Sequence, residues 1–286
     1  MFHRLRFTLI GCCASLAIAA ASTAVMADQV VSKSVKIGTR NYSADWYLPS
    51  QPAKGLVYLQ HGFQRNKSHL RELGNSLMSQ GLMVVTVSAS MTGGASSMAP
   101  QVATMLANRS MTPPTGYTLP SNYVLAGHSA GGLHVTLVGA DLVNRNDSAF
   151  RGVVLFDPVD ANNRMTAATN SIANSGRGVY AILANAGSCN SSNNAQPILR
   201  DLSPAFVGFK LTNRSAHTDA EGGSSDFFGR LFCGTPQAEN SAVLQAFAAG
   251  WAIDMLQQTS SPDFYPGGVL LQQLIAEDRA ELLKAL

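Results

Sequence analysis

The pentapeptide Gly127-His128-Ser129-Ala130-Gly131 has the residue types and spacing of a reactive serine on a tight turn. It follows the apolar run 123–126, which is typical of a buried strand, and it precedes the apolar segment 130–143, which is typical of a helix. Glycine two positions before and after the serine lets the backbone fold back sharply, because neither residue brings a side chain into the turn. The spacing predicts a serine hydroxyl displayed between the end of a strand and the start of a helix.

A serine hydroxyl is a weak nucleophile at neutral pH, so it needs a histidine to accept its proton and a carboxylate to orient that histidine. In chains with this strand-turn-helix motif the order is serine, acid, histidine, which excludes His61 and His69. His128 lies inside the turn and His134 lies one helical turn beyond it. We therefore expect His217, in the loop after the last predicted strand, to be the base.

The orienting acid must lie between the serine and His217, an interval that contains aspartates and no glutamate. In chains with this motif the acid most often lies in the loop after the strand that corresponds to 179–184, but here that loop, residues 185–194, contains no carboxylate. Asp157 ends the apolar run 153–156 and precedes Pro158, which turns the chain and directs the carboxylate toward the same sheet edge as the serine. We expect Asp157 to be the acid, with Asp160 as the alternative and with the unused aspartate capping the loop. The candidates considered are Asp141, Asp147, Asp157, Asp160 and Asp201.

Acyl-transfer chemistry also needs donors for a developing oxyanion, each worth about 3 to 4 kcal/mol in the transition state. The backbone N–H of Ala130, at the start of a helix, is one candidate. The second is the N–H of Phe63, with Gln64 as the alternative, in the turn after the strand 55–60. We expect His61 to brace this turn by hydrogen bonds.

Apolar side chains for substrate binding are expected from Phe63, Met91 and Phe227, with Phe228 as a further candidate. No metal-ligand cluster is evident, because the only closely spaced upstream histidines, at 61 and 69, have no carboxylate or cysteine partner at ligand spacing. The sequence therefore predicts neither a metal nor an organic cofactor.

The elements around these residues alternate between strand and helix, which predicts an α/β fold with a mostly parallel sheet flanked by helices. We expect one domain over residues 28–286. The stretch of about 20 residues after Asp157 leaves no room for a large lid, which predicts an uncovered site, with a shallow loop lid as the alternative. Strands are expected at 30–37, 41–48, 55–60, 82–87, 122–126, 152–156, 179–184 and 205–211, and helices at 68–79, 98–108, 130–143, 241–257 and 269–283, with a short surface helix at 198–200.

The first 27 residues have the composition of a secretory signal peptide. Arg4 and Arg6 precede the apolar stretch 7–20, and Val25-Met26-Ala27 is typical of a cleavage site. We expect cleavage after Ala27 and a secreted or periplasmic protein. A membrane anchor and lipid attachment at Cys12 are weaker interpretations.

Beyond the leader only Cys189 and Cys233 remain, and two cysteines in an exported protein predict one disulfide. It would close a loop that contains His217, with a stabilisation of roughly 3 to 4 kcal/mol. Two buried free thiols are the alternative.

The composition excludes nucleic-acid binding that depends on a strongly positive surface. The formal net charge is +3, charged residues make up 13% of the chain, and the loss of Arg4 and Arg6 would bring the charge closer to zero. Apolar residues make up 46%, enough for a sizeable core. We expect a monomer that binds no nucleic acid and has no stable membrane span.

The order of these candidate residues resembles the α/β-hydrolase superfamily over essentially the whole chain from residue 28. The residues that carry the resemblance are, in order, His61-Gly62-Phe63, the glycine-flanked turn 127–132, Asp157 and His217. The segment 156–160, F-D-P-V-D, resembles chlorophyllase-like hydrolases, whose triad acid is the aspartate of a D-P-V segment after the helix that follows the serine. The resemblance independently favours Asp157 as the acid.

Secreted cutinase-like polyester hydrolases share the lidless design and the G-H-S-x-G-G turn. The chain departs from them in two places, because it has no tryptophan after the strand 152–156 and its acid does not follow the next strand. The resemblance implies a serine esterase that acts on a small-molecule or polymeric carboxylic ester without a cofactor. A thioesterase, a cofactor-free perhydrolase and a non-catalytic binding protein are the alternatives on the same residues.

Overall fold

The computed structural model describes residues 27–92 and 96–284. Nine of the described strands form one sheet, in which the third to the eighth strand in spatial order pair in parallel and the pairings at the two edges are antiparallel. The predicted α/β class with a mostly parallel sheet is confirmed. In spatial order the strands are β1 (Gln29–Ser32), β4 (Ala44–Leu48), β6 (Met83–Val87), β5 (Leu56–Gln60), β7 (Tyr123–His128), β8 (Phe150–Phe156), β9 (Gly178–Leu183), β10 (Gly208–Leu211) and β11 (Ala280–Leu282).

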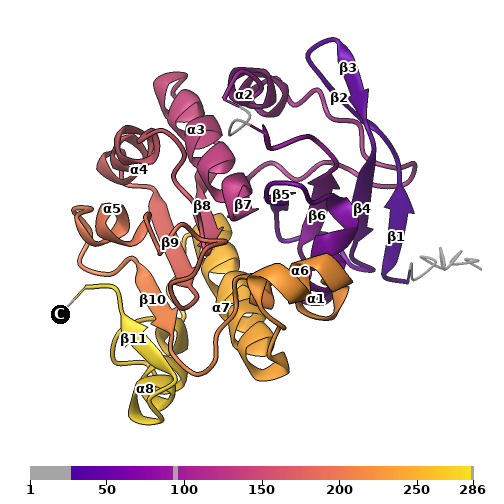
Figure 1. Cartoon of the computed structure of the whole chain (residues 1–286). Coiled ribbons are helices and arrows are strands. Elements are labelled where there is room, and N and C mark those ends of the chain that lie inside the picture. Colours follow the sequence, from indigo (N-terminus) through magenta and orange to yellow (C-terminus); the bar gives the residue numbers. More distant parts are fainter. Residues whose placement is uncertain (1–26, 93–95, 285–286) are drawn as a thin grey trace, which may run out of the picture.

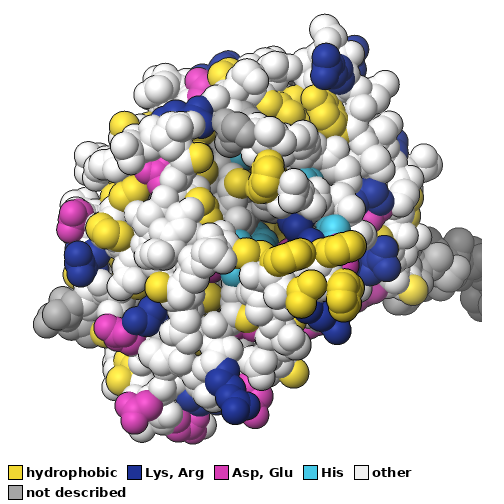
Figure 2. All heavy atoms as spheres, viewed as in Figure 1, with side chains coloured by type: hydrophobic (Ala, Val, Ile, Leu, Met, Phe, Trp, Pro, Cys, Tyr) yellow, Lys and Arg dark blue, Asp and Glu magenta, His cyan; other side chains and the backbone are white. Residues whose placement is uncertain are grey.

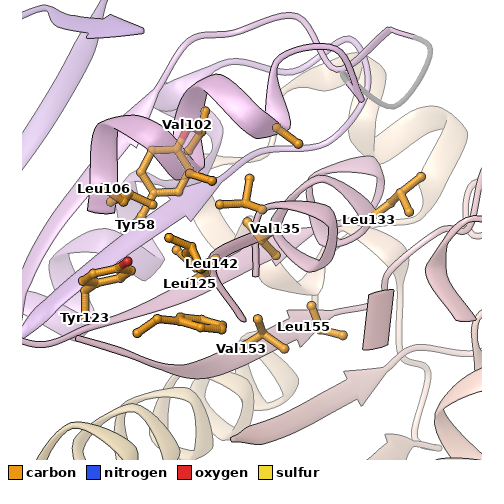
Figure 3. Close-up of a cluster of buried hydrophobic side chains, with 14 of the residues drawn as sticks. Tyr58, Val102, Leu106, Tyr123, Leu125, Leu133, Val135, Leu142, Val153 and Leu155 are labelled. Atoms are coloured by element: carbon orange, nitrogen blue, oxygen red, sulfur yellow. The ribbon is translucent and has the colours of Figure 1, made fainter. Parts of the chain in front are cut away.

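Helices cover both faces of the sheet, because the side chains of a strand point alternately to its two sides. In β7, Tyr123 and Leu125 pack into one core, whereas Val124 and Ala126 pack into the other. The first core faces the helices α2 (Ala99–Ala107), α3 (Ala130–Asn144), α4 (Met165–Asn174) and α5 (Gln196–Arg200); the second faces α1 (Arg71–Ser79), α7 (Ala238–Gln257) and α8 (Val269–Ala276) (Figure 1). Figure 3 shows side chains of β5, β7 and β8 meeting those of α2 and α3 in the first core.

Several expected elements differ in extent. The two expected opening strands are each divided, and their inner halves, β2 (Val35–Ile37) and β3 (Arg40–Tyr42), form a separate hairpin around Gly38, whose φ of 57° suits glycine. The expected helix 269–283 is wrong in its second half. It ends at Ala276, Asp278 takes a left-handed backbone with φ 53°, and the next residues add β11 to the sheet edge.

Two helices were not expected from the sequence, namely α4 and α6 (Phe227–Cys233). Short 3-10 turns complete the architecture at η1 (Lys67–Leu70), η3 (His217–Ala220), η4 (Gly222–Ser224) and η5 (Pro262–Phe264). None of the helices within 27–92 and 96–284 combines the length and apolar content that crossing a bilayer requires. The expected leader falls on residues 1–26, outside the described residues, and on Ala27.

Candidate active site

Ser129 occupies a strained turn between β7 and α3. Its backbone has φ 58° and ψ −127°, a conformation that is costly for any residue other than glycine. A side chain at Gly127 would place its Cβ 2.3 Å from the carbonyl oxygen of Gly131, and one at Gly131 would lie 2.5 Å from that of Gln60. The glycine spacing read from the sequence is therefore a steric requirement of this turn.

His217 and Asp157 lie together at the same sheet edge as Ser129. His217 begins η3 just after β10, and Asp157 follows β8. His217 Nδ1 lies 2.5 Å from Asp157 Oδ2. Because a carboxylate only accepts hydrogen bonds, the neutral imidazole carries its proton on Nδ1 and has its lone pair on Nε2. The imidazole is thus held in the tautomer that can accept a proton at Nε2.

The Asp157 carboxylate is held from two further directions. Its Oδ1 accepts from the backbone N–H of Ala184 at 3.0 Å, and its Oδ2 accepts from Asn190 Nδ2 at 3.0 Å. Asn190 is buried, and its own side-chain oxygen accepts from the backbone N–H of Gly187 and of Asn193. The Asp157 carboxylate thus reaches from the end of β8 to the loop after β9, a loop whose sequence contains amide side chains and no carboxylate.

Asp160 has a different environment. Its Oδ1 accepts from the backbone N–H groups of Arg164 and Met165 at the start of α4. Of the two candidate acids, Asp157 contacts His217, whereas Asp160 caps a helix.

The side chain of His128 holds the backbone of His217 in place. His128 Nε2 donates to the carbonyl oxygen of His217 at 2.8 Å, and the two rings lie 4.6 Å apart. Its Nδ1 has no hydrogen-bond partner and lies 3.9 Å from Glu221 Oε1. Burial lowers the pKa of His128 to about 4, so this imidazole is neutral at physiological pH.

Ser129 and His217 line one cavity of about 540 Å³. Gly62 closes in on the serine, because a side chain there would place its Cβ 2.8 Å from the Cβ of Ser129. Phe63, the next residue, lines the same cavity. Ala130 is the first residue of α3, where backbone N–H groups have no partner within the helix. The two expected oxyanion donors therefore belong to the segments that flank Ser129.

The expected apolar lining is only partly placed at this cavity. Phe63 lines it, whereas Met91 is buried in the core on the α2 and α3 face and does not. Phe227 is 70% exposed and lies outside the lining, which includes the further candidate Phe228 and also Phe232. These two come from the unexpected helix α6.

An ion-pair network borders the cavity. The guanidinium of Arg65 donates to both carboxylate oxygens of Glu221, through Nε at 2.7 Å and through Nη2, and to Asp226 at 2.9 Å. Burial is the largest single influence on the pKa of Glu221 and would raise it, but the hydrogen bond from Arg65, the nearby His128, the charge of Arg65 and the hydrogen bond from Ser225 together hold that pKa below its usual value. Asp226 also accepts from His69 Nε2 at 3.1 Å. The single positive charge of Arg65 is thus shared between the carboxylates of Glu221 and Asp226.

The predicted disulfide between Cys189 and Cys233 is confirmed, with Cα atoms 5.5 Å apart. It joins the loop that carries Asn190 to the end of α6, and both cysteines line the cavity.

His61 is buried, and its Nδ1 donates to the carbonyl oxygen of Gly62 at 2.9 Å, which braces the turn before Phe63. Burial lowers the pKa of His61 to about 4. Within residues 27–92 and 96–284, no group of three or more His, Cys, Asp or Glu side chains is placed to hold a metal ion.

Sequence reasoning missed Asn190, Arg65, Glu221 and Phe232. The only signal for Asn190 was the run of asparagines at 185–194, in the loop where a carboxylate was sought. Comparison with known proteins found no match, either to a protein-family model or to a curated protein. The functional assignment therefore depends on the site geometry.

Proposed function

We propose that the protein is a serine hydrolase of carboxylic esters that works through an acyl-enzyme. The observation that carries the proposal is the 2.5 Å contact between His217 Nδ1 and Asp157 Oδ2, which leaves His217 Nε2 free to accept a proton in the cavity that also contains Ser129. The strained backbone of Ser129 supports it, because such strain is commonly retained where function requires it.

In the first step Ser129 Oγ attacks the ester carbonyl carbon and its proton passes to His217 Nε2. The backbone N–H groups of Ala130 and Phe63 stabilise the negative charge on the carbonyl oxygen. Asp157 stabilises the imidazolium. The tetrahedral intermediate then collapses, the C–O bond to the alcohol breaks, and His217 returns its proton to the departing alkoxide.

In the second step water attacks the acyl-serine carbonyl and gives its proton to His217. This second intermediate collapses with cleavage of the bond between the acyl carbon and Ser129 Oγ, and His217 returns the proton to that oxygen, which releases the carboxylic acid and restores the Ser129 hydroxyl. Asp157 keeps one tautomer of His217 throughout, so the same Nε2 atom serves as base and then as acid.

We test this function with Ser129→Ala and p-nitrophenyl acetate. The substitution is expected to lower kcat/KM by about 10⁴-fold or more while leaving the far-UV circular dichroism spectrum unchanged. A fluorophosphonate should label the wild-type protein on the peptide that contains Ser129. The control is Ser188→Ala, which should keep the turnover of the wild type although Ser188 lines the same cavity. Labelling at Ser188, or turnover retained by S129A, would refute the proposal.

We further infer that the protein is exported and loses its leader after Ala27. The disulfide supports this, since disulfides persist in oxidising compartments. Asp28, the next residue, already takes part in the fold, because its carboxylate accepts from the backbone N–H of Ser50 at 2.6 Å. N-terminal sequencing of the exported protein should begin at Asp28; an intact leader would contradict the inference.

A further inference from the structure

Helix α6 turns its apolar side chains outward. Phe227, Phe228, Leu231 and Phe232 are 60 to 70% exposed, and Gly229 is the only buried residue of the helix. Most surface helices of globular proteins direct their apolar face to the core instead. We call these four side chains, together with Phe63, the apolar rim. Figure 2 shows hydrophobic side chains gathered over α6, beside a hollow in which histidine side chains are visible.

Polar and covalent contacts hold α6 in place. Asp226 caps the helix by accepting from the backbone N–H of Gly229, and it is bound by Arg65. A side chain at Gly229 would place its Cβ 2.5 Å from Arg65 Nη2, so the helix packs directly on that guanidinium. Cys233 anchors the other end through the disulfide to Cys189. The exposed phenyl groups are therefore not needed to attach the helix, and an exposed apolar patch of this kind is typical of a surface that binds another molecule.

The rim is continuous with the cavity that contains Ser129. Phe228 and Phe232, four residues apart on one stripe of the helix, line the cavity with their rings parallel and 6.5 Å apart. Phe227 and Leu231 form the neighbouring stripe, which lies outside the cavity lining. The apolar wall of the site thus extends beyond its mouth onto the protein surface.

The charge around the rim favours an uncharged occupant. Arg65 is paired with Glu221 and Asp226, and Arg230 of α6 donates to the backbone carbonyl of Gly223. These cations are already engaged, whereas binding to an anionic membrane surface depends on clusters of free Lys and Arg. An uncharged, extended apolar ligand fits both observations, because it can fill the cavity, cover the adjoining apolar surface and do so without a charged partner.

We propose that the apolar rim adsorbs the hydrophobic chain segments of a water-insoluble ester, solid or emulsified, so that one of its ester bonds reaches Ser129. This inference rests on the proposed esterase function and names its substrate class. A short soluble ester occupies only the cavity, whereas an insoluble one also covers Phe227 and Leu231.

The experiment measures adsorption separately from catalysis. Proteins that carry Ser129→Ala are incubated with polycaprolactone particles, and the unbound fraction is measured after pelleting. Adding Phe227→Ser and Leu231→Ser should weaken adsorption by at least about tenfold, because two apolar side chains no longer leave water on binding. Leu231→Ser alone should give an intermediate loss. The control pair is Val30→Ser with Val269→Ser, two exposed apolar residues that belong neither to the apolar rim nor to the cavity lining, and it should adsorb as the parent does.

In the active protein, F227S/L231S should lower the ratio of polycaprolactone to p-nitrophenyl acetate hydrolysis by about tenfold. Three results would overturn the proposal: unchanged adsorption of the F227S/L231S protein, a dimer in sedimentation that this variant abolishes, or tighter binding to phosphatidylcholine vesicles than to polyester. Failure of the esterase function is recognised separately. It appears as absent p-nitrophenyl acetate turnover in the wild type, while adsorption still tests the rim.

Discussion

Acidification should destabilise the fold through two histidines that are buried without charge. His61 and His128 are 1% and 2% exposed, and each has a ring nitrogen without a hydrogen-bond partner. Burial lowers the pKa of both to about 4. Both flank the candidate site, since His61 braces the turn before Phe63 and His128 holds the backbone of His217.

The sign follows from comparing the two states. An unfolded histidine titrates near about pH 6.5, so between that value and about pH 4 the unfolded chain holds protons that the folded chain lacks. The stability is therefore complete above about pH 6.5 and is lost as the pH falls toward about 4. From about pH 7 to about pH 5 each histidine removes about 2 kcal/mol from the free energy of unfolding, and the pair removes about 4 kcal/mol.

Urea unfolding at several pH values, with the disulfide intact, measures this loss. The double variant H61Q/H128Q cannot titrate at these positions, so its free energy of unfolding should change by about 4 kcal/mol less than that of the wild type over the same range. NMR titration of the imidazole Cε1–H signals gives each pKa directly. A wild-type stability at pH 5 within about 1 kcal/mol of that at pH 7, or ring titration near about pH 6.5, would refute the reasoning.

Two further predictions concern the support of the acid. Asn190→Ala removes the buried amide that donates to Asp157, and kcat/KM for p-nitrophenyl acetate should fall about 10- to 100-fold, as expected for a hydrogen bond to a charged group; a loss under about twofold would exclude this role. Replacing Cys189 and Cys233 together by serine should lower the free energy of unfolding by about 3 to 4 kcal/mol in urea titrations and also lower kcat/KM, because Cys189 precedes Asn190. Unchanged stability would contradict the first part, and unchanged turnover the second.

Much of the fold could be predicted because local patterns and tertiary packing agree in the sheet. The apolar runs of β5, β7 and β8 are buried on both faces, so they read as continuous hydrophobic strands. Helix α6 escaped prediction because its apolar residues have no core to face. One continuous helix was wrongly predicted over 269–283, because β11 is only three residues long and shares its composition with the preceding helix.

At the candidate site, the placement of Ser129, Asp157 and His217 at one edge followed from a general property, since the carboxyl ends of parallel strands meet at the same side of a sheet. The partners of these residues did not follow. Asn190 contacts Asp157 across 33 positions and Arg65 contacts Glu221 across 156, and no local pattern encodes such pairs. Met91 was misplaced for the same reason, because periodicity identifies an apolar residue without showing which cavity it faces.

Positive backbone φ occurs at several places among the described non-glycine residues, and at this edge it includes the two proposed functional residues Ser129 and Asp157. Four non-glycine residues with positive φ follow four strands of the parallel sheet: Gln64 after β5, Ser129 after β7, Asp157 after β8 and Arg214 after β10, with φ between 42° and 58°. Each costs about 1 to 2 kcal/mol, and a glycine at any of them would relieve the strain. Two of the four are the proposed nucleophile and its acid, whose side chains a glycine would lack. The strain therefore persists where a side chain is needed in a backbone conformation that glycine prefers.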